Sequence, residues 1–410
     1  MKVKYQGLTL VVDNAQVKAY LAGSGTVDLG IEGCAYGEQV LVRLELLDGT
    51  TVLCSDEIRV LVAPYFVSPN SHPADEVFVS FTGDSSVLTA FTAGLSGIAP
   101  LRKSSDYPVG TGSPSMRYIQ DHVEFGYTRT AVGQSTYKSS QVILGLHGAE
   151  PTLLDLIDND RAFYWESEVM YEFGDLLLAP PTTARPYGTV VCGKNHAYKD
   201  FLKRQKVQPE SGNVVEIDDT WLATPHVDTL VAFIPVSGGY KVLVADLQLA
   251  MDLLAANPGE SVESLSDLRS QYTDPANATT IAAINAKLAS LYDDLETGLG
   301  VPKSQYIHVP VAFNVTDAMG AIHPWLPILV NMQYVTSGGG ERVFVPKAYF
   351  APFWIDGTDG LKGKLNGIGI SDAEIQIVPT SASGYSPFNG GNGGDAHCIS
   401  NPSMEAPSTP

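Results

Sequence analysis

The sequence of 410 residues predicts two regions of different fold class, a small all-β region followed by a large mixed α/β domain. Two observations support this. The first 60 residues alternate short apolar runs with turn residues, as all-β domains do. The remainder combines β-branched runs with segments whose apolar residues recur at helical spacing. The sequence pattern changes at Pro64 and the turn at Ser68-Pro69-Asn70, which places the boundary near residue 63. The predicted domains are therefore residues 1–62 and 63–410.

The N-terminal region is predicted to be built from short strands. Residues 8–12, 40–47 and 58–62 are apolar and rich in strand-forming residues. Asp48-Gly49 lies between two of these runs and is a hairpin turn signal. We therefore expect a sandwich-like β domain here.

The larger region is predicted to mix strands and helices. The strand-like runs are residues 77–81, 142–146, 229–235 and 375–378. Residues 243–256 and 279–299 have helical spacing, and the second segment carries one apolar stripe made of Ile281, Ile284, Leu288, Leu291 and Leu295. No internal repeat is visible in the residues, and we expect the tail from Asn401 to be mobile.

The charge balance narrows the classes of partner. The formal net charge is −20, from 45 acidic and 25 basic residues. This argues against nucleic acid or anionic membrane, because both are bound through basic patches. The negative charge favours binding of cationic substrates, but it is explained equally well by an acidic surface that only keeps the protein soluble. No run approaches the roughly 20 apolar residues of a membrane-spanning helix, and the first residues lack a signal-peptide core. We expect a cytoplasmic protein, with a mature secreted form as the alternative.

His226 and Asp228 form the first candidate site. If Pro225 begins the strand that continues to Phe233, the two side chains point to the same face of that strand. An imidazole beside a carboxylate suits acid–base catalysis or binding of a cation. The pattern is short, so taken alone a metal site or a polar strand end explains it better.

Two further segments carry reactive side chains. Gln120, Asp121 and Glu124 lie between aromatic and apolar residues, although taken alone a turn with solvated carboxylates explains them better. Cys398 follows His397 at the end of a Gly-rich stretch, whose glycines allow the backbone to approach a ligand closely. A single cysteine with a distant histidine is a candidate nucleophile, and an inert buried thiol is the alternative.

Taken together, these segments resemble the catalytic domain of the protein-arginine deiminases, which belong to the guanidine-modifying pentein superfamily. The matching motifs are Gln120-Asp121 with Glu124-Phe125-Gly126-Tyr127, Trp221-Leu222-Ala223 before His226-Val227-Asp228, and His397-Cys398 before Asn401. Weaker matches are Ala63-Pro64, Ser68-Pro69-Asn70, Phe173-Gly174, Ala179-Pro180-Pro181 and Asn331-Met332. The resemblance covers about residues 59–405 and implies a five-bladed α/β propeller, preceded here by a small immunoglobulin-like sandwich domain.

The resemblance also implies a role for each site residue. Cys398 is the nucleophile, His226 the general acid and base, and Asp121 and Asp228 bind the guanidinium nitrogens, while Tyr118 lines the channel in place of a tryptophan. Two carboxylates suit the planar fork of donors on arginine. A thiolate attacks the guanidinium carbon better than a neutral thiol does. The implied hydrolase converts arginine into citrulline and ammonia through a covalent thiouronium intermediate.

Three functions are compatible with these residues. The resemblance favours a peptidyl-arginine deiminase acting on arginine-containing peptides or proteins. Residues 145–150 contain no arginine, whereas the animal enzymes hold the substrate backbone with a pair of arginines there. This departure favours a deiminase of a free guanidine such as arginine or agmatine. A catalytically silent arginine-binding module is the third possibility, but it would not need Cys398.

Calcium is the one cofactor that the resemblance implies, and the sequence argues against it. The remaining candidate ligands are the side chains of Gln120 and Glu124, the backbone carbonyls of Phe173 and Leu176, and Asp175 as a partial substitute. His122 and Leu177 occupy positions where the family has acidic residues. Because calcium takes six to eight oxygen ligands, we expect no cofactor and calcium-independent activity, with one weakened calcium site as the alternative.

Overall fold

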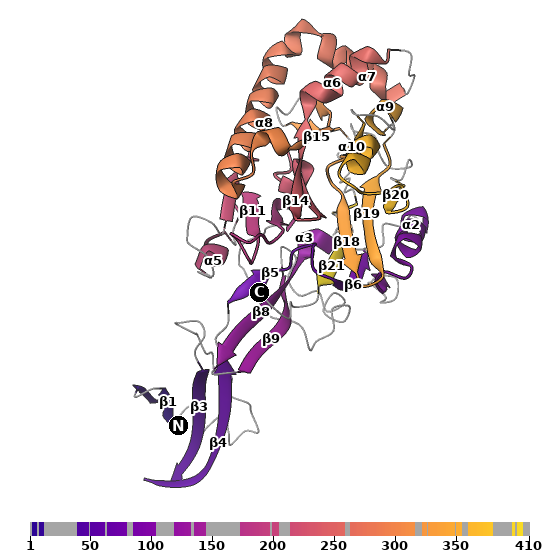
Figure 1. The fold of residues 1–410 in the computed structure, drawn as a ribbon. Coiled ribbons are helices and arrows are strands. Elements are labelled where there is room, and N and C mark those ends of the chain that lie inside the picture. Colours follow the sequence, from indigo (N-terminus) through magenta and orange to yellow (C-terminus); the bar gives the residue numbers. More distant parts are fainter. Residues whose placement is uncertain are drawn as a thin grey trace. The chain divides into compact units, whose positions relative to one another are not determined.

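The structure is a computed structural model that describes residues 2–5, 8–11, 39–48, 50–61, 64–79, 85–103, 119–132, 135–144, 173–196, 199–204, 214–258, 263–315, 322–325, 327–348, 350–354, 360–379, 396–397 and 400–404. The chain divides into two compact units. One is Met1–Tyr65 with Thr128–Ser139, and the other is Phe66–Tyr127 with Ser140–Pro410. The predicted mixed α/β class is confirmed (Figure 1).

The first unit contains a four-stranded antiparallel sheet among its described residues. Its strand order is β2 (Leu8–Val11), β1 (Lys2–Tyr5), β3 (Gln39–Asp48) and β4 (Thr51–Leu61). Asp48 pairs with Thr51, so β3 and β4 form a hairpin at the predicted turn. The strand expected at residues 58–62 starts earlier, because β4 pairs with β3 along its whole length.

Four sheets of the second unit share one plan, in which the middle strand is antiparallel to the first strand and parallel to the third. Their strands are β10 (Leu176–Ala179), β11 (Thr189–Gly193) and β12 (Val214–Ile217); β13 (Val231–Val236), β14 (Gly239–Asp246) and β15 (Ile307–Pro310); β18 (Gln333–Ser337), β19 (Gly340–Pro346) and β20 (Ile375–Val378); and β21 (Ser400–Met404), β6 (Ala74–Val79) and β7 (Leu101–Lys103). The same arrangement of strands therefore recurs along the chain, although no repeat is visible in the amino-acid sequence.

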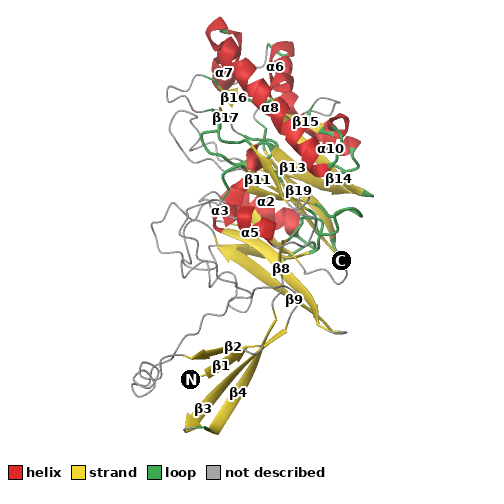
Figure 2. Ribbon diagram, turned by 90° about the vertical axis from the view of Figure 1, so that its left-hand side faces the viewer, coloured by secondary structure: helices red, strands yellow, loops and turns green. Residues whose placement is uncertain are grey.

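A parallel pair needs a crossover connection, and helices supply it in all four sheets. The crossovers contain α2 (Ser85–Leu95) before β7, α5 (Lys199–Arg204) before β12, α6 (Leu247–Ala256), α7 (Glu263–Thr273) and α8 (Ala278–Leu299) before β15, and α9 (Ala351–Trp354) and α10 (Leu361–Gly367) before β20. The helices α6, α7 and α8 lie together (Figure 2). The five residues of the stripe predicted on α8 are all buried.

The remaining elements are short or belong to both units. Strands β5 (Tyr65–Val67), β8 (Val123–Val132) and β9 (Ser135–Leu144) form a further sheet. The others are α3 (Ile119–His122), η3 (Phe173–Asp175), η5 (Val227–Thr229), η6 (Pro275–Asn277), η7 (Lys303–Gln305), β16 (Phe313–Asn314) and β17 (His323–Pro324). None of the helices in the described part of the chain is long and apolar enough to cross a membrane.

Two predicted elements are wrong. Residues 243–246 were expected to open a helix, but they are the end of β14, and α6 starts at Leu247 with Asp246 as its N-cap. Leu243 and Val244 pair on both sides, and Leu243, Val244 and Ala245 are fully buried; such a buried apolar run does not distinguish a strand from a helix. The tail expected to be mobile from Asn401 forms β21, which pairs with β6 and is buried.

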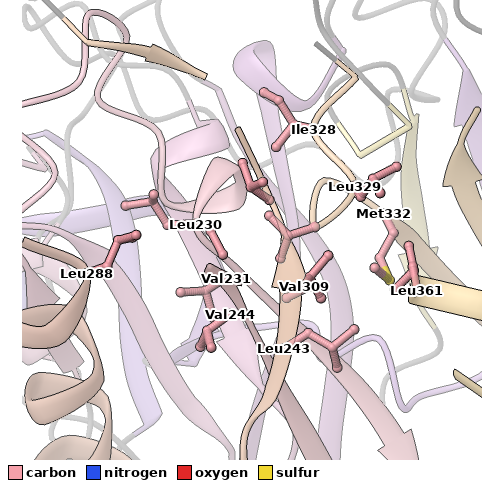
Figure 3. Close-up of a cluster of buried hydrophobic side chains, with 14 of the residues drawn as sticks. Leu230, Val231, Leu243, Val244, Leu288, Val309, Ile328, Leu329, Met332 and Leu361 are labelled. Carbon is pink, nitrogen blue, oxygen red and sulfur yellow. The ribbon is translucent and has the colours of Figure 1, made fainter. Parts of the chain in front are cut away.

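The core of the second unit supports the site directly. Leu230, Val231, Leu243 and Val244 pack with Val309 and with side chains from the helices and from the segment before β18 (Figure 3). Each fully buried side chain of this size contributes about 1.5–3 kcal/mol relative to an exposed one. The η5 turn is anchored in this core, because Val227 and Leu230 are completely buried.

Candidate active site

The site residues occupy equivalent positions in the repeated sheets. His226 and Asp228 lie just before β13, Asn331 just before β18, His397 just before β21, and Asp175 just before β10. Glu124 lies at the start of β8, and Gln120 lies in α3, which directly precedes β8. Side chains from these segments line one pocket, whose residues include Gln120, Glu124, Leu176, Asp228, Gln333, His397 and Asn401. The shared plan of the sheets therefore explains why distant sequence segments meet.

Asp228 is the centre of this pocket. Its side chain is 1% exposed, and its Oδ2 atom lies 2.9 Å from Nδ1 of His397. Its Oδ1 atom lies 4.0 Å from Nδ1 of His226, which is also buried. The carboxylate thus stands between two imidazoles, one within hydrogen-bond distance and one beyond it.

The local backbone places His226 and Asp228 differently from the prediction. They were expected on one face of a strand, but Val227–Thr229 forms the 3-10 turn η5 and β13 begins only at Val231. The hydroxyl of Thr229 donates to the His226 carbonyl at 2.6 Å, and the Leu230 amide donates to Val227 at 2.9 Å. The two side chains come together because the chain turns, not because a strand alternates.

Asparagine side chains hold the segment around His397. The His397 amide donates to Oδ1 of Asn331 at 3.0 Å, and Nδ2 of Asn331 lies 3.5 Å from the carbonyl oxygen of Asp228. Nδ2 of Asn401 donates to the Val123 carbonyl at 2.7 Å. The chain is therefore fixed on both sides of Cys398. Cys398 and Tyr118 lie outside the described residues, and of Asp121 only the backbone, in α3, is described.

Gln120 and Glu124 form a second polar pair in the pocket. Nε2 of Gln120 donates to Oε2 of Glu124 at 2.9 Å, and both side chains are buried. Burial raises the pKa of Glu124 to about 8, and the hydrogen bond from Gln120 opposes this shift. The prediction of solvated carboxylates on a turn does not apply to Glu124.

Sequence reasoning missed a buried carboxyl pair near the pocket. Asp175 and Asp219 meet over Gly193, where a Cβ atom would overlap both carboxyl groups. Both side chains are at most 6% exposed. Burial, and then the interaction with Asp219, raises the pKa of Asp175 to about 10. The sequence signal is weak, because Asp218-Asp219 beside Thr220 looks like a solvated turn.

The candidate calcium ligands contact one another in the structure. Gln120 and Glu124 bond to each other, Asp175 faces Asp219, and the partly buried aliphatic side chain of Leu177 stands where the resemblance expects a carboxylate. Leu177 offers no side-chain oxygen to calcium, which takes six to eight oxygen ligands. Within the described ranges, no group of three or more His, Cys, Asp or Glu side chains is placed to hold a metal ion.

The fold and the sequence motifs together define one protein family. The sequence model of the protein-arginine deiminase family matches residues 52–405, so the chain belongs to this family. Protein-arginine deiminase type-4 of Mus musculus is 24% identical over 439 residues, which cover 92% of this chain and 61% of that protein. Protein-arginine deiminase type-1 of Homo sapiens is 23% identical, with 82% and 54% covered.

The chain spans little more than half the length of these two relatives. Among solved structures, an agmatine deiminase of C. jejuni is similar over 84% of this chain and 98% of its own, with a TM-score of 0.46 and 10% sequence identity.

Proposed function

We propose that this protein is a peptidyl-arginine deiminase, a hydrolase that converts arginine residues of peptides or proteins into citrulline and releases ammonia. The observation that carries the proposal is the Asp228 carboxylate, buried in a pocket between His226 and His397, with Cys398 as the next residue of the chain. Membership of the protein-arginine deiminase family supports chemistry on a guanidinium group.

Substrate binding in this proposal depends on Asp228 and Asp121. A guanidinium presents five N–H donors in a rigid plane, and a carboxylate accepts two of them side by side. Asp228 is almost inaccessible to solvent, and such an interaction is stronger in a medium of low polarity than in water. A second carboxylate, assigned to Asp121, would bind the remaining nitrogens and centre the guanidinium carbon.

The reaction would follow two steps. The Cys398 thiolate forms a bond to the guanidinium carbon, and a C–N bond breaks as His226 protonates the departing nitrogen. The product of this step is ammonia and a thiouronium joined to Cys398. Water then attacks the same carbon, His226 takes up its proton, and the C–S bond breaks. The second proton of the water passes to solvent as the carbonyl of citrulline forms, so this step releases citrulline and regenerates the thiolate.

We also propose that the sheets of the second unit are blades of a five-bladed propeller. The shared plan of the four sheets supports this. The N-terminal β region would be an immunoglobulin-like sandwich domain. We further propose that activity is independent of calcium, which the mutual bonding of Gln120 and Glu124 supports.

A second candidate function is deimination of a free guanidine. The observation that favours it is the absence of arginine from residues 145–150, where the animal enzymes hold the peptide backbone. The net charge of −20 attracts cationic substrates of either kind and does not distinguish them.

One experiment separates these functions. Ammonia and citrulline release would be measured with an arginine-containing peptide blocked at both ends, with free arginine and with agmatine. We expect the peptide to have a kcat/KM at least tenfold above that of either small molecule. A preference for free arginine or agmatine would replace the proposal with the second candidate, and no release from any of the three would defeat both.

A further inference from the structure

His397 has no part in the reaction proposed above, yet its imidazole lies within hydrogen-bond distance of the Asp228 carboxylate. Its Nδ1 atom lies 2.9 Å from Oδ2 of Asp228, whereas His226 is 4.0 Å from the other oxygen. Hydrogen bonds between N–H and oxygen fall between about 2.7 and 3.2 Å. The proposed function uses Asp228 as an anion, and an anionic carboxylate only accepts, so in this proposal Nδ1 of His397 carries the proton of the hydrogen bond.

We infer that His397 is a positioning residue: its Nδ1–H holds Oδ2 of Asp228 and thereby directs Oδ1 toward the guanidinium of the substrate. This inference rests on the proposed function. A buried carboxylate with one oxygen anchored has a single orientation, and hydrogen bonds to a charged group are stronger than neutral ones. His226, whose Nδ1 lies 4.0 Å from Oδ1 of Asp228, keeps the role of acid and base assigned to it in the proposed function.

The backbone reinforces this arrangement. Asn331 accepts the His397 amide at 3.0 Å, and its Nδ2 lies 3.5 Å from the Asp228 carbonyl oxygen, so one asparagine connects both residues. His397 is also joined covalently to Cys398. The residue that orients the substrate-binding carboxylate is thus the neighbour of the predicted nucleophile. Small errors in the placement of reacting groups lower rates by about 100-fold, so this link has consequences for catalysis.

The chain contains a matched pair outside the pocket. Nδ1 of His308 lies 2.8 Å from Oδ2 of Asp246, an ion-pair contact of the same atoms at nearly the same distance but without the hydrogen-bond geometry of the His397 contact. His308 is 38% exposed and does not line the pocket around Asp228. A variant of His308 therefore controls for the loss of an aspartate–histidine contact without a role in the site.

The test compares three substitutions at one position. In His397→Asn the amide nitrogen lies near the place of Nδ1, in His397→Gln it lies nearer the place of Nε2, and in His397→Ala it is absent. We expect His397→Ala and His397→Gln to lower kcat/KM for the blocked peptide by about 10- to 150-fold. His397→Asn should stay within about threefold of the wild type, since it keeps the donor. His308→Ala should leave kcat/KM unchanged.

Two further readouts separate positioning from a merely structural role. In an Asp228→Asn background, His397→Ala should add less than about threefold, because residues that act as a unit are not additive. The pH profile of kcat/KM for His397→Asn should keep both limbs of the wild-type profile, because His397 transfers no proton. Melting temperatures and circular dichroism establish that each variant is folded.

The outcomes are distinct. If the wild type is active and His397→Asn is as impaired as His397→Ala, the hydrogen bond does not position Asp228 and the inference is wrong. If the His397→Asn profile loses a limb, His397 is an acid or base and the inference is also wrong. If the wild type releases ammonia from no guanidine, the proposed function itself fails and the inference fails with it.

Discussion

Two buried carboxyl groups of the second unit, those of Asp228 and Asp175, differ in the side chains that contact them. Both are nearly inaccessible to solvent, and both lie just before the first strand of a sheet. Asp228 lies within hydrogen-bond distance of the His397 imidazole and lines the pocket. Asp175 meets a second carboxyl group, that of Asp219, over Gly193. The position before the first strand thus holds an aspartate in both sheets, but the two aspartates have different partners.

The neighbouring side chains affect whether a buried carboxyl group is ionised. Two carboxylates in contact cannot both be ionised in a buried site at an acceptable free energy, so one retains its proton. The pKa of Asp175 is accordingly raised to about 10, first by burial and then by Asp219. A protonated carboxyl group does not bind a guanidinium as an anion. A buried carboxylate therefore suits substrate binding where its neighbours can donate hydrogen bonds, as the imidazoles beside Asp228 can.

The largest expected effect tests whether the Asp228 pocket acts through Cys398 at all. Cys398→Ser should lower citrulline formation by on the order of 10⁴-fold or more, because a hydroxyl is far less ionised than a thiol at neutral pH. The measurement is citrulline release from the blocked peptide, with the exposed Cys54 replaced by serine as the control. Activity above a few per cent in Cys398→Ser would exclude the covalent mechanism.

The next prediction tests whether Asp228 binds the substrate and Asp175 does not. Asp228→Asn and Asp121→Asn should each lower kcat/KM by about 150- to 5,000-fold, which corresponds to about 3–5 kcal/mol for breaking a buried charge pair. Asp175→Asn should change kcat/KM less than tenfold, since an amide replaces a protonated carboxyl group of the same shape. Equal losses in Asp175→Asn and Asp228→Asn would show that the two carboxylates share one function.

A third test uses the stability of the fold. An acid whose folded pKa is raised releases its proton on unfolding, so stability falls as pH rises from about 4 to about 10, by at most about 1.4 kcal/mol per pH unit. Asp175→Asn removes this dependence. The variant should be a few kcal/mol more stable than the wild type at pH 8, and the difference should shrink toward pH 5. Urea unfolding at pH 5, 7 and 8 measures it.

Asp218 provides the control of opposite sign for this experiment. A hydrogen bond from Lys287 lowers the pKa of Asp218 to about 2, so its contribution to stability is present above the unfolded pKa and lost as pH falls toward 2. Asp218→Asn should destabilise by no more than about 1 kcal/mol at pH 8, because the pair is partly exposed. A destabilised Asp175→Asn at pH 8 would mean that Asp175 is ionised in the folded protein.

The smallest expected effect concerns calcium. The pocket side chains Gln120 and Glu124 bond to each other, so we expect the citrullination rate in excess chelator to be within a few-fold of the rate in millimolar calcium. Rates would be compared with magnesium at equal ionic strength as the control. A stimulation of tenfold or more by calcium alone would show that the pair opens to bind the ion.

The amino-acid sequence by itself predicted the candidate site residues and determined much of the local structure. The stripe on α8 is a 3.6-residue period and predicts the helix and its buried face. Asp48-Gly49 predicts the hairpin of the first unit. His226 and Asp228 were predicted as one site from their types and spacing, and the motif pattern indicated the family that the comparison with known sequences confirms. These features are local, so a single chain displays them.

The tertiary structure alone decided which of these groups meet. The partner of Asp228 is His397, 169 residues further along the chain, and its contact depends on the turn η5 and on β21 pairing with β6. The repeated sheet plan and the Asp175–Asp219 pair are equally invisible in the residues. The chemistry of a residue and the periodicity of a segment can be recognised from neighbouring residues in the sequence. Strand pairing and contacts within 3 Å depend on how the whole chain packs.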